Sequence, residues 1–264
     1  NLKAHWKLNE SSGTTINDSS SSNINGTISG SPNLNVDGYN FNSDNAIHFD
    51  GINDYITLPH SSLKSYFHQT SFAISLWVKF NNSTISSEET IFCLTESSST
   101  NKMLIISRNA NEKIVFTFYE NDLFSIDPFT RTDWNNFTFV YDHSSTTKKI
   151  FINGNFNRSD STASPDLDGA VSAFIGRRIS TDERLLNGSL SDIRIYDIAF
   201  TNGQVKDLYN HSLVYAKSYN EVNDSCLFFN SSKYIKLSNI SKTFDYSFTI
   251  SAWIKVVSSC NQFI

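Results

Sequence analysis

The sequence has few cysteines, no long apolar run and no cluster of basic residues. Three cysteines in 264 residues are too few to frame a small disulfide-bonded fold, and their spacing matches no metal-binding motif. No apolar run approaches the roughly 18–20 residues that a membrane-spanning helix needs. The formal net charge of -5 is spread without a Lys or Arg block, so the chain lacks an electrostatic footprint for nucleic acid or an anionic membrane. We therefore expect no nucleic-acid partner and no direct membrane insertion.

The cysteines and the glycosylation sequons bear on location. Cys93 lies in the apolar run TIFCL, which predicts a buried thiol. Cys226 and Cys260 could form a disulfide if the protein is secreted, and the sequence leaves this open. About a dozen N-x-S/T sequons favour an extracellular or cell-surface location, although an Asn- and Ser-rich chain generates several by chance. The sequon at Asn136 lies in a predicted buried strand.

Sequence motifs for catalysis are missing as well. The six His residues show no H-x-x-x-H spacing, no G-x-S-x-G elbow is present, and no Gly-rich phosphate loop precedes a helix. Glu88 and Glu89 are adjacent, so in a strand they would point to opposite faces. Asp122 and Asp127 fall in a predicted loop, and we interpret all four carboxylates as solvated charges. We therefore expect no enzymatic activity.

Aromatic and apolar residues are abundant enough to build a core. Apolar residues make up 39% of the chain, with 21 Phe, 11 Tyr and 4 Trp, and each aromatic side chain buries about 150–250 Å². Period-two alternation in FAISLWVKF (72–80) places the even-numbered residues on one face and the odd-numbered residues on the other. Comparable runs predict strands over residues 46–50, 55–58, 103–107, 113–120, 135–142, 148–152, 173–176 and 189–197. Many short strands with polar turns predict an all-β, antiparallel sandwich.

Two local signals mark a hairpin and a helix. Asn153-Gly154 separates two strand-like runs, and a type I′ turn needs a positive φ at both of its central positions. In TNGQVKDLY, Thr201 can cap a helix, and Gln204 can return the bond to the Thr201 amide. We expect a short C-terminal helix that closes the domain.

One part of the pattern occurs twice. SFAISLWVKF (71–80) returns as SFTISAWIKV (247–256), and AIHFDGINDYITL (46–58) is echoed by CLFFNSSKYIKL (226–237). The two matched segments keep their order and a similar spacing. Such a repeat indicates a duplicated module rather than one strand reused within a fold.

The duplication sets the expected domain boundaries. A complete module spans residues 1–212, a linker spans 213–225, and the truncated start of a second module spans 226–264. The N-terminus has neither an initiating Met nor a signal-peptide pattern. We expect the chain to be a piece of a longer protein with further tandem domains.

The first module carries an ordered set of motifs. They are AHWKLNESSGTTINDSSSSNINGTISG (4–30), AIHFDGINDYITL, SFAISLWVKF, Trp134 opening a strand, FINGNF (151–156), FIGRR (174–178) and GSLSDIRIYDIAFTNGQVKDLY (188–209). Together they resemble the laminin-G-like jelly-roll family of the concanavalin A-like lectin/glucanase superfamily. The resemblance implies an antiparallel jelly-roll β-sandwich. The superfamily's glucanases carry an E-x-D-x-x-E strand, and nothing in this chain matches it.

The resemblance also implies a structural calcium site. Members of the family often hold Ca²⁺ where the opening loop meets the closing D-x-R-I-Y strand. The matching positions are Asp18 and Asn25, the carbonyl of Gly26, and Asp192, and oxygen atoms of these kinds suit this hard cation. The alternative is that Asp18 caps a turn and that Asp192 pairs with an arginine such as Arg194.

A glycan site usually shows an exposed aromatic platform on which a sugar ring can stack. Trp6, Trp77, Trp134 and Trp253 all fall in strand motifs that resemble the family's structural ones. We interpret each of them as core or inter-sheet packing.

The segment YENDLFSIDPFTR offers better ligand candidates. It places Tyr119, Phe124 and Phe129 among polar residues. Arg177 and Arg178, which follow the FIG strand motif, could reach a polar or acidic ligand. The alternatives are that the two phenylalanines fold back under the loop as a satellite cluster and that the arginines form a solvated rim.

These observations predict a non-catalytic extracellular recognition module. It would bind a glycan or an extracellular protein, as a carbohydrate-binding or adhesive domain that calcium would stabilise if the ion binds. The first alternative is a structural or protein-interaction sandwich without a glycan site. The second is a glycoside hydrolase, which requires a carboxylate pair built from residues distant in sequence. Fold alone does not decide among them.

Overall fold

The computed structural model describes residues 1–39, 45–81, 87–96, 99–126, 129–161, 164–179 and 184–212. By its contacts the chain divides into two units, Asn1–Asp224 and Ser225–Ile264, and all described residues lie in the first. The predicted second module, with its two cysteines and Trp253, lies outside the described residues, as does Asp127. The predicted domain boundaries therefore stay predictions.

The described strands form two sheets in which neighbouring strands run antiparallel. Sheet A has the order β14-β13-β12-β7-β16-β5-β4, with β1 paired to β16. Its bounds are β1 (Leu2–Trp6), β4 (Asn33–Asp37), β5 (Asn45–Asp50), β7 (Phe72–Phe80), β12 (Asn135–Asp142), β13 (Thr147–Ile152), β14 (Asn155–Ser161) and β16 (Asn187–Tyr196). Sheet B has the order β11-β10-β9-β8-β15-β6-β3-β2. Its bounds are β2 (Thr15–Ile16), β3 (Gly26–Ser29), β6 (Tyr55–Leu58), β8 (Glu89–Thr95), β9 (Met103–Arg108), β10 (Ile114–Thr117), β11 (Asp122–Phe124) and β15 (Ser172–Ile175).

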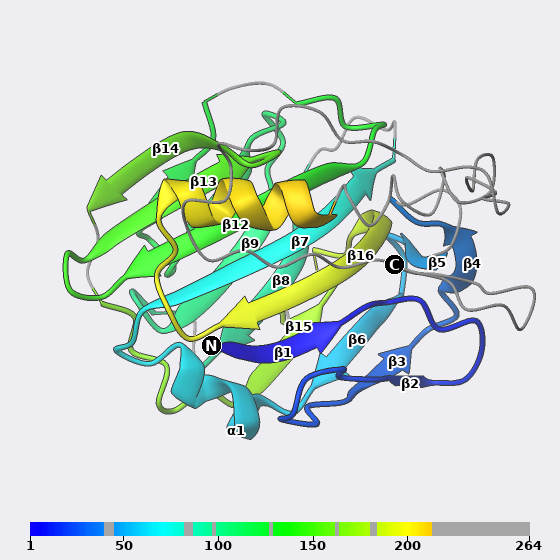
Figure 1. Ribbon diagram of the computed structural model, residues 1–264. Coiled ribbons are helices and arrows are strands. Elements are labelled where there is room, and N and C mark those ends of the chain that lie inside the picture. Colours follow the sequence, from blue (N-terminus) through cyan, green and yellow to red (C-terminus); the bar gives the residue numbers. More distant parts are fainter. Residues whose placement is uncertain are drawn as a thin grey trace, which may run out of the picture. The chain divides into compact units, whose positions relative to one another are not determined.

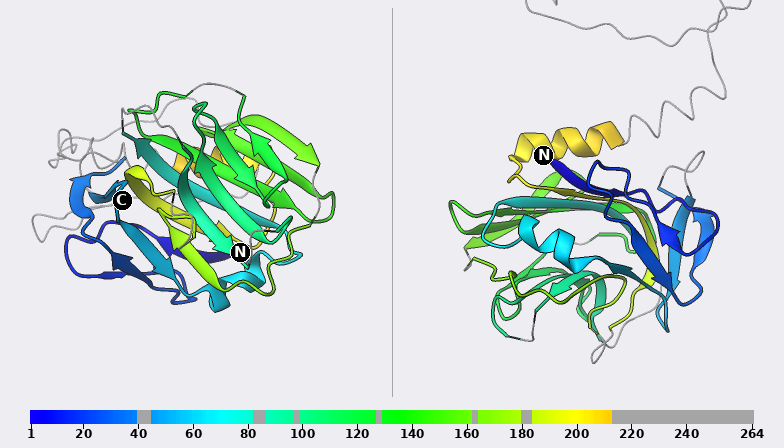
Figure 2. Two further views of the ribbon diagram at one scale, coloured as in Figure 1. Left: turned by 180° about the vertical axis from the view of Figure 1, so that it is seen from behind. Right: turned by 90° about the horizontal axis from the view of Figure 1, so that it is seen from below.

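The two sheets pack face to face, with sheet A in front of sheet B in Figure 1. A helix over residues 202–212 crosses the outer face of sheet A, as the edge-on view of Figure 2 shows. Its Val205 packs in a cluster with Ala73, Val140 and Phe151 of that sheet. Two short turns of helix, α1 (His60–Leu63) and η1 (Lys64–Tyr66), precede β7. This arrangement confirms the predicted antiparallel β-sandwich with its C-terminal helix.

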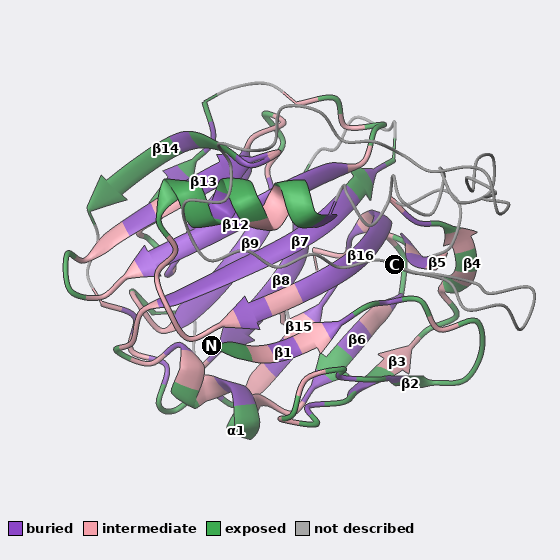
Figure 3. Ribbon diagram, in the orientation of Figure 1, coloured by how far each residue is buried: buried purple, intermediate pink, exposed green. Residues whose placement is uncertain are grey.

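Strand β7 shows why these segments become strands. Its even-numbered residues, from Phe72 to Phe80, belong to the core between the sheets, and its odd-numbered residues face the helix side, as the alternation predicts. Figure 3 shows the central strands of sheet A buried along most of their length, whereas the edge strand β14 is largely exposed. Burial on both faces follows because the helix covers the outer face.

The two local signals are confirmed in detail. Asn153 and Gly154 have φ values of 51° and 73° and join β13 to β14. The Thr201 amide donates to Oε1 of Gln204 at 2.9 Å, and the Gln204 amide donates to Oγ1 of Thr201 at 3.3 Å. The C-terminal helix therefore begins with a reciprocal capping box.

The interpretation of the tryptophans as core or inter-sheet packing needs one correction. Trp6 is fully buried in the core, but Trp77 lies on the outer face of sheet A. Its ring stacks on Tyr39 with centroids 4.3 Å apart and on Tyr209 of the C-terminal helix at 5.8 Å. The reason is its odd-numbered position in β7, which points away from sheet B.

The interpretation of Glu88 and Glu89 as solvated charges is wrong. Glu89 is buried between the sheets, and its Oε2 accepts hydrogen bonds from Nε and Nη2 of Arg108 at 3.1 and 2.6 Å. Glu88 is largely buried on the outer side of sheet B. The two carboxylates do point to opposite faces, and each is buried because a guanidinium group meets it there.

Among the described residues, no helix is long and apolar enough to cross a membrane.

Candidate functional site

A groove lies on the outer face of sheet B, where β9, β10 and β11 run side by side. Across these strands Ile105 faces Thr117, and Thr117 faces Asp122. In the next row Val115 faces Phe124. Opposite residues of antiparallel strands share one face of the sheet, so these five side chains lie together in the lining of the groove.

The groove has a floor of buried residues and two walls of different character. Its volume is about 250 Å³. The floor residues Ile105, Val115 and Thr117 are each no more than 4% exposed. Strand β11 and the turn before it form one wall, and Glu88 and Arg178, next to β8 and β15, form the other. The groove is thus a depression with polar walls over a floor of two aliphatic side chains and one threonine.

Cys93 lies in the apolar layer beside the floor. It is fully buried with Met103 and Ile105, under Tyr119. Burial raises the pKa of the Cys93 thiol, the main cause being desolvation of the thiolate. The predicted buried thiol is confirmed, and the residue supports the floor rather than offering a nucleophile.

Three neighbouring side chains of the groove have unused recognition groups. Oγ1 of Thr117 is buried and has no hydrogen-bond partner among the described residues. The Asp122 carboxylate is exposed and accepts no hydrogen bond from any described residue. The Phe124 ring is 36% exposed. Together they offer a hydroxyl, a carboxylate and an apolar ring edge to a ligand.

The opposite wall is a charge network centred on Glu88. Its Oε2 lies 2.7 Å from Nη1 of Arg184 and 3.5 Å from Nη1 of Arg178. Its Oε1 accepts a hydrogen bond from the Ser107 hydroxyl. The Arg178 guanidinium also lies over the Tyr119 ring, 5.6 Å from its centroid. Arg178 is therefore held between the Glu88 carboxylate and the Tyr119 ring.

The turn between β10 and β11 explains a wrong prediction. Residues 122–124 form strand β11, not a loop. Tyr119 and Glu120 adopt φ values of 58° and 61°, the left-handed pair of a tight hairpin, without the Asn or Gly that would signal it. Lys148 supports this turn from below, since its buried ammonium donates to the carbonyl of Asn121. Burial lowers the pKa of Lys148 to about 8.

The structure brings together three of the five predicted ligand residues, Tyr119, Phe124 and Arg178. Phe129 instead folds back, as its alternative predicted, but it packs against the main core rather than in a satellite cluster, with its ring centroid 5.1 Å from that of Phe137. Arg177 lies over Tyr55, 4.4 Å from its ring centroid.

Sequence reasoning missed Thr117 and Glu88 as groove residues. The alternation within KIVFTFYE could have placed Val115 and Thr117 on the outer face. No signal in the sequence pairs Glu88 with Arg178, because they lie far apart in the chain, next to two different strands.

The residues predicted to hold calcium lie near the N-terminal strand. Asp18 accepts four hydrogen bonds of 2.8 Å: its Oδ1 from the amides of His5 and Ser20, and its Oδ2 from the Ser20 hydroxyl and the Ile24 amide. Burial raises the pKa of Asp18, but the backbone donors outweigh it and hold the pKa below its ordinary value. The Asp18 amide in turn donates to Asn25 at 2.8 Å.

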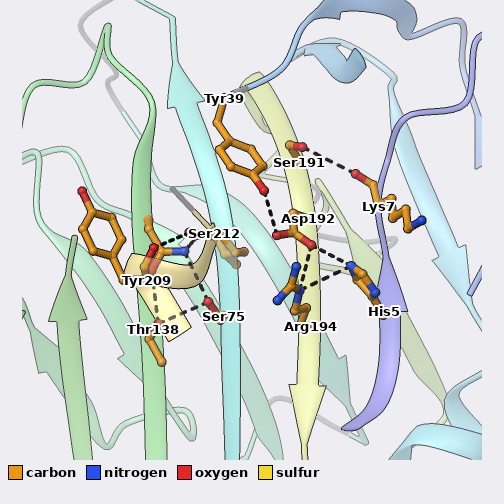
Figure 4. Close-up of polar contacts among 12 residues, drawn as sticks. His5, Lys7, Tyr39, Ser75, Thr138, Ser191, Asp192, Arg194, Tyr209 and Ser212 are labelled. Atoms are coloured by element: carbon orange, nitrogen blue, oxygen red, sulfur yellow. Dashed lines mark hydrogen bonds and ion pairs between the residues drawn. The ribbon is translucent and has the colours of Figure 1, made fainter. Parts of the chain in front are cut away.

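Asp192 is held by a different set of partners. It lies at a bulge of β16, with φ of 53°, where the register to β7 shifts. Its Oδ1 is 2.7 Å from Nε2 of His5 and 2.9 Å from Nε of Arg194, and its Oδ2 accepts from the Tyr39 hydroxyl at 3.3 Å (Figure 4). The alternative in which Asp192 pairs with Arg194 thus describes its contacts.

These contacts bear on whether calcium fits. Four donors occupy the lone pairs of Asp18, and a guanidinium group lies against Asp192. Gly26 packs in β3 against Ile56, where an added Cβ would come within 2.6 Å of a side-chain methyl. In this arrangement the residues do not fit a cation, since Asp18 would have to exchange hydrogen bonds for it. Among the described residues, no three His, Cys, Asp or Glu side chains gather as a metal site would. Calcium binding stays a prediction of the family resemblance, and the contacts of Asp18 and Asp192 argue against it.

Comparison with known proteins gives the family. A family model, that of the concanavalin A-like lectin/glucanases superfamily, matches residues 50–206. The chain belongs to this superfamily. Its laminin-G-like membership, inferred from the ordered motifs, is confirmed by the match. No curated protein matches the sequence.

Solved structures share the fold of this laminin-G-like domain at low sequence identity. Domain 4 of AbnA, a GH43 extracellular arabinanase from Geobacillus stearothermophilus, in complex with arabinotriose, is 22% identical with a TM-score of 0.58, and the match covers 79% of this chain and 98% of that one. The botulinum neurotoxin serotype D binding domain is 15% identical with a TM-score of 0.62, covering 81% and 52%. The binding domain of Paraclostridial Mosquitocidal Protein 1 is 19% identical with a TM-score of 0.60, covering 80% and 52%. The chain spans about half the length of each of these last two binding domains. At identities of 22% or less, the similarity shows the fold alone.

Proposed function

We propose that this laminin-G-like domain is a non-catalytic glycan-binding module and that its ligand lies in the groove on the outer face of sheet B. Support comes from the groove itself and from the arabinotriose complex of the AbnA domain, which matches over nearly its whole length. An extracellular location and a role in adhesion belong to the same proposal. The sequons and the extracellular arabinanase relative support the location.

One observation carries the proposal: Thr117, Asp122 and Phe124 present unused groups within one groove. A sugar ring has a rim of hydroxyl groups around faces of C–H groups. The Asp122 carboxylate can accept hydrogen bonds from the hydroxyl groups, and the exposed Phe124 ring can pack against a C–H face. Small-molecule sites combine apolar contact with a few placed polar groups in this way.

The same groove contains three carboxylates, Glu88, Glu120 and Asp122. They are the groups that the glycoside hydrolase alternative would use. A glycosidase needs one carboxyl group that protonates the leaving oxygen. Glu88 is surrounded by Arg178, Arg184 and the Ser107 hydroxyl. Glu120 accepts a hydrogen bond from Thr100 and is exposed, as is Asp122. Glu88 and Glu120 thus act as hydrogen-bond acceptors, and no contact of the three carboxylates with a described residue marks one of them as a proton donor.

Calorimetric titration of the full chain tests the proposal. The ligand is the best binder from an array that includes arabinotriose. We expect D122A to weaken binding about tenfold or more, because a hydrogen bond to a charged group contributes about 1.5–3 kcal/mol. We expect F124A to weaken it as well, through lost apolar contact.

Two variants serve as controls for the titration. F156A removes an exposed aromatic ring of β14, and D207N removes an exposed charge of the C-terminal helix, both outside the groove. They should bind as the wild type does. Unchanged affinity in D122A and F124A would place any glycan site elsewhere, release of reducing sugar would favour the hydrolase, and no binding to any glycan would favour the protein-interaction alternative.

A further inference from the structure

We propose that the groove selects neutral oligosaccharides and rejects anionic ones such as sialylated, sulfated or uronate-containing glycans, with Glu120 and Asp122 as the residues that determine this specificity. The inference rests on the proposed function and adds the class of glycan. It follows from which partners the charged groups of the two walls already contact.

The wall formed by β11 and its turn is negative. Glu120 and Asp122 are both exposed and both line the groove. Among the described residues, the Glu120 carboxylate accepts a hydrogen bond only from the neutral Thr100 hydroxyl, and the Asp122 carboxylate accepts none. An anionic sugar in the groove would therefore approach two carboxylates at short range. Like charges placed together in this way disfavour binding.

The cations of the opposite wall lie against a carboxylate of their own. Arg178 carries the only positive charge among the described residues that line the groove. Its guanidinium and that of Arg184 both lie against Glu88. Lys148, below the turn, is 1% exposed and donates to the carbonyls of Phe116 and Asn121, so its ammonium interacts with the Asp122 charge from the core side and does not reach the groove surface. A carboxylate or sulfate on the ligand would compete with Glu88 for these guanidinium groups.

A second feature points to a hydroxyl-rich ligand. Thr117 lines the groove and is 4% exposed, and its buried Oγ1 has no partner among the described residues. Thr117 faces Asp122 across the β10–β11 pair, where the Cβ atoms of opposite residues are about 4.5–5.5 Å apart. A sugar hydroxyl between them can donate to Asp122 and accept from Thr117. A carboxylate in the same place could only accept, and it would face Asp122.

The test compares matched ligands on the full chain. An array of neutral arabinan, xylan, glucan and galactan oligosaccharides is set beside the uronate, sulfated or sialylated counterpart of each. We expect the best neutral oligosaccharide to bind at least about tenfold more tightly than its anionic counterpart in about 0.1 M salt. The ratio should shrink in about 1 M salt, where the screening length falls from about 10 Å to about 3 Å.

The variant E120Q/D122N should reduce this discrimination by raising affinity for the anionic ligands. The control D133N/D207N removes the same charge at exposed positions outside the groove and should leave the ratio unchanged. Equal or tighter binding of anionic glycans by the wild type would overturn the specificity and leave glycan binding standing. Failure of every oligosaccharide to bind would overturn the proposed function, and the specificity with it.

Discussion

Replacement of Arg108 by Met is expected to lower the free energy of unfolding by about 3–5 kcal/mol, because it leaves the Glu89 carboxylate buried without its partner. Arg108 is fully buried, with two hydrogen bonds to Glu89, one to Glu112 at 3.0 Å, and the ring of Phe80 4.4 Å from its guanidinium carbon. Urea unfolding followed by tryptophan fluorescence measures the loss.

The loss should depend on pH. Burial raises the pKa of Glu89 even with Arg108 present, and removal of the guanidinium raises it further. The folded state then binds a proton more readily than the unfolded state, so stability falls as pH rises through the interval between the two pKa values. We expect R108M to be more destabilised at about pH 8 than at about pH 5. An equal loss at both would mean that lost packing, not the orphaned charge, is responsible.

Arg131 provides a matched control for Arg108. It contacts the same Glu112 at 3.0 Å, but its side chain is 29% exposed. R131M should therefore cost no more than about 1 kcal/mol, as exposed pairs do. The double variant E89L/R108M should recover much of the stability, since apolar replacements of a buried ion pair are often neutral.

Replacement of Asp18 by Ala is expected to cost about 3 kcal/mol or more. It leaves the buried amide of Ile24 and the partly buried amides of His5 and Ser20 without an acceptor, and an orphaned buried donor costs about 1–3 kcal/mol. Because the folded-state pKa of Asp18 is lowered, its contribution is present above the unfolded pKa and lost as pH falls through the folded one. The difference between wild type and D18A should therefore narrow in acid.

Asp142 is the matched control for Asp18. It accepts from the amide and hydroxyl of Ser144 and from the hydroxyl of Ser145, but all three bonds are exposed. Water can replace the carboxylate there, so D142A should cost less than about 1 kcal/mol. Equal losses in D18A and D142A would contradict the burial argument.

The same unfolding measurement tests whether calcium binds. A bound ion would add stability that grows with its concentration. Since hydrogen bonds occupy Asp18, we expect the wild type to be equally stable in calcium and in chelator. Added stability in calcium that D18A lacks would instead support the predicted ligands.

Strand existence was predictable because the signals are local. Period-two alternation identified β7, β12 and β16, and Asn153-Gly154 identified the hairpin of β13 and β14. The signal failed for β11, which has three residues, too few to show alternation, and follows a turn whose left-handed residues are Tyr119 and Glu120. Tertiary contacts stabilise this left-handed turn. A turn stabilised by its own sequence would have contained a glycine that revealed it.

The candidate site was predictable only in part, for the same reason. The sequence predicted that Tyr119, Phe124 and Arg178 belong to a ligand surface, since aromatic and cationic residues stand out within polar segments. It misplaced Phe129, because no local pattern tells an outward ring from one that folds onto Phe137.

The sequence by itself determined the sandwich class, the family, the hairpin turn and the capped C-terminal helix, because neighbouring residues encode each of these. Only the tertiary structure decided which charges are exposed and which residues share a groove. Glu88 meets Arg178, and Thr117 faces Asp122, through the pairing of strands across sheet B. Strand register depends on the burial of a whole face at once, and a single segment of sequence does not contain it.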